Sequence, residues 1–141
     1  MTCYNSIRIP APIEDVWAIL DDFTELDAFK AQVKIVEHTN DIPGDQPGCQ
    51  RLLNGVFLET LLKMDHETYT IVYTIDQGPP EMGKPQGYIG TIQLHRITTD
   101  NSTFAAWSSR WESSEGDTAG FVNPICQRFL HNMQKYFAAA G

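Results

Sequence analysis

The chain has 141 residues, of which 42% are hydrophobic and 20% charged, so it can bury a core of its own and one domain over residues 1–141 is expected. Eighteen acidic residues against ten lysines and arginines give a net charge of −8, which argues against nucleic-acid binding and against attraction to an anionic membrane. The three cysteines are widely spaced and form no CxxC pair, which favours reduced thiols. No signal-peptide pattern occurs, and no apolar run reaches the ~20 residues that would span a bilayer. We therefore expect a cytoplasmic protein that does not insert into membranes.

The first third of the chain predicts one strand and then two short helices. Residues 3–9 alternate, with apolar side chains on one side. Pro12 suits the first turn of a helix, and the apolar residues from Ile13 to Leu20 recur at helical spacing. A second short helix is predicted over residues 24–29.

A series of strands separated by turns follows. Strands are predicted over residues 32–39, 49–53, 56–64, 69–76, 88–97 and 103–112. Asn54-Gly55 is a strong hairpin signal, and residues 77–87 form a long loop rich in Gly and Pro. Because consecutive strands are joined through turns, we expect an antiparallel meander.

The last element is a long helix with one apolar face. Its apolar positions follow a period near 3.6 and are Val122, Cys126, Phe129, Met133 and either Tyr136 or Phe137. Asn123 could cap this helix with Pro124 opening it, whereas a start near Thr118 would place Pro124 inside it. A single helix covering a strongly curved sheet would leave a space between the two, and this space is a candidate binding pocket.

This order of elements resembles the SRPBCC superfamily, also called START-like or helix-grip proteins, and within it the polyketide cyclase/dehydrase group. The resemblance covers nearly the whole chain, and its motifs are residues 10–23 (PAPIEDVWAILDDF), 48–51 (GCQR), 55–65 (GVFLETLLKMD), 73–79 (YTIDQGP) and 103–111 (TFAAWSSRW). It implies an α+β helix-grip fold, in which a curved antiparallel sheet of about seven strands wraps around a long C-terminal helix. Two short helices would follow the first strand.

The resemblance also implies a cavity between the sheet and the last helix, which in relatives holds apolar or amphipathic small molecules, lipids among them. Some relatives are cyclases, whereas others only bind or sense, and fold alone does not decide between these functions. The loop at Pro80–Gly87 lies where relatives place a flap over the cavity mouth. The longer first-hairpin loop of the plant hormone receptors is replaced here by Asn54-Gly55, which argues against a plant-like hormone switch.

Glu59 is the candidate catalytic residue. It interrupts the apolar run VFLETLL, and its counterparts in relatives often face the cavity, where a desolvated carboxylate suits general acid or base work. The alternative is a solvent-facing Glu on an alternating strand. Arg51 is the natural counter-charge if the two side chains share a face of the sheet.

The turn at Asn54-Gly55 decides whether they do. A two-residue loop would pair Arg51 with Leu58 and place Glu59 on the other face. A three-residue loop from Leu53 to Gly55, with Gly55 at a bulge, would pair Arg51 with Phe57 and leave Arg51 and Glu59 on one face. We predict the second register, which the resemblance favours.

Aromatic residues are frequent on the apolar faces of the later predicted strands. Tyr and Trp offer apolar surface with one polar group, which suits an amphipathic ligand, although ordinary core packing explains them equally well. Ser109 lies in the same phase and could donate to a ligand carbonyl, but no nucleophile motif surrounds it. The predicted ligand-binding residues are Arg51, Phe57, Glu59, Tyr73, Tyr88, Trp107, Ser109, Trp111, Phe129 and Met133.

No metal or cofactor is expected, because the four histidines lack metal-ligand spacing and no phosphate loop occurs. The first hypothesis is a binding protein for a small hydrophobic or amphipathic molecule. The second is a polyketide cyclase/dehydratase-like enzyme, with Glu59 as acid or base, a Tyr hydroxyl orienting a carbonyl and Arg51 stabilising enolate charge. A third is a partner-binding domain, which would need a large exposed apolar patch.

Overall fold

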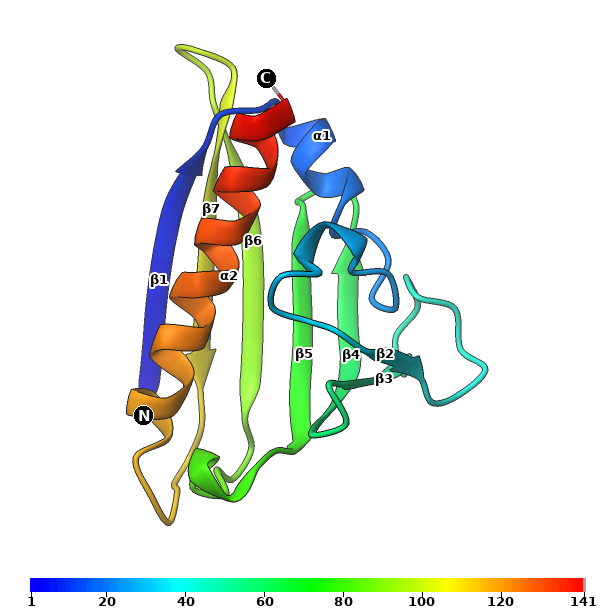
Figure 1. The fold of residues 1–141 in the computed structure, drawn as a ribbon, viewed down its shortest axis with the longest axis vertical. Coiled ribbons are helices and arrows are strands. Elements are labelled where there is room, and N and C mark those ends of the chain that lie inside the picture. The colour runs from blue at the N-terminus through cyan, green and yellow to red at the C-terminus, as the bar shows by residue number, and fades with distance from the viewer. Residues whose placement is uncertain (141) are drawn as a thin grey trace.

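A computed structural model describes residues 1–140 of the chain. It shows the α+β helix-grip fold, with seven antiparallel strands in the order β1-β7-β6-β5-β4-β3-β2 and one long helix (Figure 1). The elements are β1 (Thr2–Ile9), α1 (Ile13–Ala18), the 3-10 helix η1 (Asp27–Phe29), β2 (Val36–His38), β3 (Gln50–Leu53), β4 (Phe57–Asp65), β5 (Thr70–Gln77), the 3-10 helix η2 (Pro80–Met82), β6 (Ile89–Ile97), β7 (Ser102–Arg110) and α2 (Thr118–Ala140).

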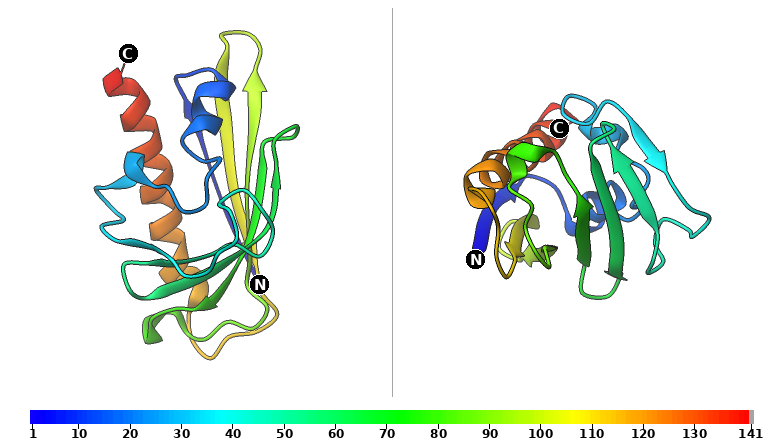
Figure 2. Two further views of the ribbon diagram at one scale, coloured as in Figure 1. Left: turned by 90° about the vertical axis from the view of Figure 1, so that its right-hand side faces the viewer. Right: turned by 90° about the horizontal axis from the view of Figure 1, so that it is seen from below.

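The sheet is an antiparallel meander from β2 to β7, and β1 returns to pair with β7. Figure 2 shows the sheet curving around one side of the molecule, with α2, α1 and η1 on its concave side. The concave side buries the core, and α2 packs there most closely against β1. Among residues 1–140, no helix is both long and apolar enough to cross a bilayer.

Two predicted elements near residue 30 are shorter than expected. The helix predicted over residues 24–29 is only η1, because Asp22 accepts hydrogen bonds from the backbone N–H and the hydroxyl of Thr24 and so turns the chain locally. The strand predicted over residues 32–39 is only β2. Residues 32–35 are not paired in the sheet, since the backbone N–H groups of Gln32 and Val33 donate to the carbonyl of Phe29.

The hairpin register differs from the predicted one by two residues. Leu53 pairs with Phe57 and Arg51 pairs directly with Glu59, so the three-residue loop is 54–56. Asn54 and Gly55 both have positive φ, at 52° and 71°. The prediction that Arg51 pairs with Phe57 was wrong, whereas the prediction that Arg51 and Glu59 share one face is confirmed.

The long helix begins at Thr118, so Pro124 lies inside it and Asn123 does not cap it. The first turn is capped by Asp117, whose Oδ1 accepts a hydrogen bond from the backbone N–H of Gly120 at 3.0 Å. Asn123 instead joins the helix to the sheet, because its Oδ1 accepts a hydrogen bond from Nδ2 of Asn5 at 2.8 Å. Of the two candidates near the end of the apolar face, Phe137 packs against the core while Tyr136 is exposed.

Candidate functional site

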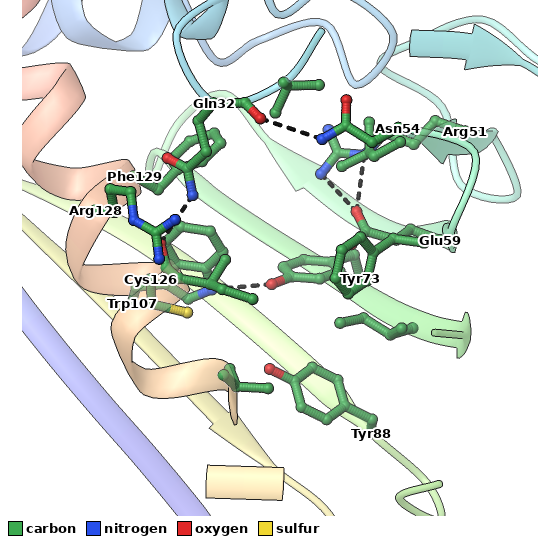
Figure 3. A pocket seen from close by; sticks show the side chains of 16 residues that line it. Gln32, Arg51, Asn54, Glu59, Tyr73, Tyr88, Trp107, Cys126, Arg128 and Phe129 are labelled. Atoms are coloured by element: carbon green, nitrogen blue, oxygen red, sulfur yellow. Dashed lines mark hydrogen bonds and ion pairs between the residues drawn. The ribbon is translucent and has the colours of Figure 1, made fainter. Parts of the chain in front are cut away.

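A cavity of about 190 Å³ lies between the concave face of the sheet and α2 (Figure 3). Cavities of ~150 Å³ lined by apolar side chains accommodate benzene, so this space suits a ligand of about one aromatic ring with short substituents. The side chains that line it are mostly apolar or aromatic, and come from the segment before β2, from β3 to β7 and from α2. They are Gln32, Val33, Arg51, Leu53, Asn54, Phe57, Glu59, Tyr73, Ile75, Tyr88, Trp107, Val122, Ile125, Cys126, Arg128 and Phe129.

Arg51 and Glu59 form a buried ion pair on one wall of the cavity. Both Nε and Nη2 of Arg51 approach Oε1 of Glu59, at 2.9 and 2.7 Å. The third nitrogen, Nη1, donates to the backbone carbonyl of Phe23 at 2.9 Å, and the guanidinium lies 3.7 Å from the centre of the Phe23 ring. Each nitrogen of Arg51 therefore has a protein partner.

The two carboxylate oxygens of Glu59 differ in their hydrogen bonding. Oε1 accepts the Arg51 bonds, whereas Oε2 makes no hydrogen bond to any residue of the described chain. Burial raises the pKa of Glu59 above its ordinary value, and Arg51 limits the rise. This combination of a free oxygen and a raised pKa suits proton transfer, provided that a ligand reaches Oε2.

Tyr73 and Trp107 form a second polar contact in the wall. Trp107 Nε1 donates to the Tyr73 hydroxyl at 3.0 Å, and the Tyr73 hydroxyl donates its own proton to no acceptor within residues 1–140. Gly90, the strand partner of Tyr73, makes room for this ring, since a Cβ at residue 90 would overlap with Tyr73 Cζ. Burial raises the pKa of Tyr73 well above its ordinary value, so the group is a neutral donor.

Tyr88 carries a buried hydroxyl without a hydrogen-bond partner in the described part of the chain. Its side chain is 2% exposed, and Figure 3 shows the hydroxyl pointing from the sheet toward α2. Ser109 lies near enough to lower the pKa of Tyr88 a little, against the larger rise caused by burial, but not in hydrogen-bonding geometry. The Tyr88 ring stacks on Trp111, with ring centres 5.7 Å apart.

The exposed lining residues, Asn54 and Arg128, mark where the cavity reaches solvent. Asn54 is fixed there, because its Oδ1 accepts from the backbone N–H groups of Lys34 and Ile35 and its Nδ2 donates to the Gln32 carbonyl. Arg128 makes no ion pair with any residue in the described range. The mouth of the cavity therefore carries one positive charge, that of Arg128, which forms no ion pair within the described residues.

The structure brings together seven of the ten predicted binding residues in the cavity wall: Arg51, Phe57, Glu59, Tyr73, Tyr88, Trp107 and Phe129. The other three do not line the cavity. Ser109 and Trp111 are buried beside Tyr88, and Met133 is buried one turn beyond Phe129 in α2.

Several lining residues were absent from the predicted set. Val122 and Cys126 lie on the helix face that the sequence periodicity identified, so the same periodicity could have predicted them as lining residues. Gln32 and Asn54 reach the site through turn contacts that no periodicity indicates. Burial raises the pKa of the Cys126 thiol to about 12, so it is a weakly reactive part of the wall. Residues 1–140 hold no cluster of three or more potential metal ligands.

The family model described as polyketide cyclase / dehydrase and lipid transport matches residues 2–138. A structure of a Nitrosospira multiformis protein is 31% identical, with a TM-score of 0.93, and the match covers 97% of this chain and 96% of that one. The Bacillus cereus protein XoxI is 22% identical, with a TM-score of 0.79 and coverage of 97% and 95%. Ara h 8.0201 is 16% identical, with a TM-score of 0.77 and coverage of 99% and 98%. No curated protein matches the sequence significantly.

Proposed function

Because the chain belongs to the polyketide cyclase/dehydrase and lipid transport family of the SRPBCC superfamily, we propose that it binds a small hydrophobic or amphipathic molecule between the sheet and α2. The observation that carries this proposal is the cavity of about 190 Å³. A pocket of this size whose lining is mostly apolar and aromatic is typical of small-molecule sites. The proposal includes a cytoplasmic location, where the ligand would be a metabolite or lipid.

The composition of the wall supports a ligand that is mainly apolar. Phe57, Trp107 and Phe129 supply broad apolar surfaces, and Trp107 and Phe129 meet edge to face with ring centres 5.0 Å apart. A few oriented polar groups in an apolar cavity are typical of small-molecule sites, because they fix the orientation of a ligand that apolar contacts hold. Tyr73 and Tyr88 are such groups here.

A titration with α-methylstyrene, followed by protein NMR, tests the proposal. We expect saturable shifts for amides of the cavity wall. Cys126→Phe puts a ring into the cavity and should remove these shifts, whereas Gln127→Phe puts the same ring on the exposed side of α2 and should preserve them. Mass spectrometry of an organic extract of the purified protein should also reveal a lipophile in the wild type and none in Cys126→Phe. Equal binding by both variants would exclude the cavity as the site.

A cyclase/dehydratase-like activity is the second candidate, and the free Oε2 of Glu59 favours it. Such chemistry begins when a base removes a proton next to a carbonyl, forming an enolate. We expect the wild type to speed deuterium exchange into the methyl group of acetophenone in D₂O, and Glu59→Gln to lose this effect. A wild-type rate equal to that of buffer would leave binding as the function.

A further inference from the structure

We infer, on the basis of the proposed function, that Tyr88 selects ligands with a neutral carbonyl group and holds the carbonyl oxygen inside the cavity. A buried hydroxyl without a partner has lost its hydrogen bonds to water and gained none in the protein, so it is less favourable than one that is hydrogen-bonded. Only 2% of the surface of Tyr88 is exposed, and the residue lines the cavity. Its hydroxyl lacks a hydrogen-bond partner within residues 1–140. A ligand acceptor placed in the cavity would satisfy it.

Trp111 shows why the position of Tyr88 matters. The Trp111 Nε1–H is also buried without a partner in the described chain, but Trp111 does not line the cavity. A ligand in the cavity would therefore reach Tyr88 and not Trp111. Tyr73 adds a second donor in the same wall, since its hydroxyl accepts from Trp107 and keeps its own proton free.

The charges of the wall favour a neutral acceptor over a carboxylate. Arg51 is compensated by Glu59 at 2.7 Å, and its remaining nitrogen is bonded to the Phe23 carbonyl. A buried anion would lie near the Glu59 carboxylate without a free counter-charge, and burying an unpaired charge is costly. The one other cation of the lining, Arg128, is at the exposed mouth. An anionic group of a longer ligand would thus project outward while the neutral carbonyl lies inward.

A matched pair of probes tests this inference. Acetophenone and α-methylstyrene have the same ring and branching, and differ by an oxygen in place of a methylene group. We expect wild-type protein to bind acetophenone about 3- to 10-fold more tightly, which is the range of a net gain from one hydrogen bond. Benzoate should bind more weakly than either probe. NMR titrations of the same protein sample give all three dissociation constants.

Tyr88→Phe should reduce the preference for acetophenone to the part that the Tyr73 hydroxyl supplies, and leave the affinity for α-methylstyrene unchanged. Tyr136→Phe removes a hydroxyl from an exposed ring on the same molecule and should keep the wild-type preference. Without ligand, Tyr88→Phe should unfold at the same or a higher temperature than wild type, because it removes an unsatisfied buried group.

The outcomes separate this inference from the proposed function. Binding of both probes with equal affinity by the wild type, or an unchanged preference in Tyr88→Phe, would overturn the role of Tyr88 while leaving the cavity as a binding site. Tighter binding of benzoate than of acetophenone would overturn the neutral-ligand rule. Binding of none of the probes would count against the proposed function itself.

Discussion

Arg51 and Glu59 show how a buried pair can position a carboxylate without offering a free positive charge. Arg51 is held by Glu59, by the Phe23 carbonyl and by the Phe23 ring, so it is already engaged before a ligand arrives. A role for Arg51 in stabilising enolate charge would require breaking these contacts. Tyr73 and Tyr88 are better placed for that role, since both have hydroxyl protons without acceptors among residues 1–140.

The pair predicts a strongly non-additive effect on stability. Arg51→Met leaves the Glu59 charge buried and uncompensated, which should lower the free energy of unfolding by about 3–5 kcal/mol. Replacing both partners, with Arg51→Met and Glu59→Leu, should cost much less than this single change, because no unpaired charge is left. Urea denaturation of wild type, both single variants and the double variant measures the coupling. A double variant whose loss equals the sum of the single losses would show that the pair does not act as a unit.

The raised pKa of Glu59 predicts the sign of a pH effect. Because its pKa is higher in the folded than in the unfolded chain, the stabilisation linked to this group is fully present below the unfolded value, ~4.3, and is lost as pH rises through the folded value. Glu59→Gln does not titrate. We therefore expect wild type to lose stability relative to Glu59→Gln as pH rises from about 4 toward neutrality. Denaturation of both proteins across this range gives the difference, and a difference that changes in the opposite direction would show that Arg51 outweighs burial.

Strands and turns position the site, and they also show where sequence reasoning succeeds. Asn54-Gly55 predicted the hairpin because both residue types tolerate positive φ, and the family resemblance favoured a position of Glu59 on the inner face. The register itself depends on Asn54, whose side chain is bonded to the backbone of residues 32–35. Such contacts join segments about 20 residues apart, so local patterns do not reveal them. The Arg51–Glu59 pair and the aromatic residues of the wall were therefore predictable from the sequence, whereas Gln32 and Asn54 at the turns were not.

Gly90 of β6 is an element-level feature that links the sheet to the cavity. Gly90→Ala would drive the Tyr73 ring from its position, because the added Cβ would lie 2.6 Å from the Tyr73 hydroxyl oxygen. We expect the affinity for α-methylstyrene to fall about tenfold or more, as a displaced ring takes up cavity space and costs ~1–3 kcal/mol of packing. Thr91→Ala, at the adjacent position of β6, is the matched control and should bind normally. Unchanged affinity in Gly90→Ala would mean that the Tyr73 position does not shape the site.

At the scale of the whole molecule, the cavity exists because one helix covers a sheet that curves away from it. Sequence patterns predicted the strands, the antiparallel meander and the single long helix, whereas the family resemblance implied that the sheet wraps around that helix. The way in which the loop 77–87 meets the segment before α2 was not predictable, because it depends on hydrogen bonds between residues far apart in the chain. The backbone N–H of Gln86 donates to the Ser113 carbonyl and that of Glu115 to the Gly83 carbonyl, both at 2.7 Å. Thr118 adds a side-chain bond to the Met82 carbonyl at 2.6 Å.

These bonds predict that ligands enter beside Arg128 rather than through the loop 77–87. Thr118→Val removes the bond to Met82 and leaves that carbonyl unsatisfied, which should lower stability by about 1–3 kcal/mol. It should also speed hydrogen exchange at the amides of Gln86 and Glu115, because the loop opens more often. If ligands pass the mouth at Arg128, the dissociation rate of α-methylstyrene, measured by NMR line shapes, should stay within about twofold of wild type. A dissociation rate that rises in parallel with amide exchange would identify the loop as the gate, since both processes would then depend on the same opening.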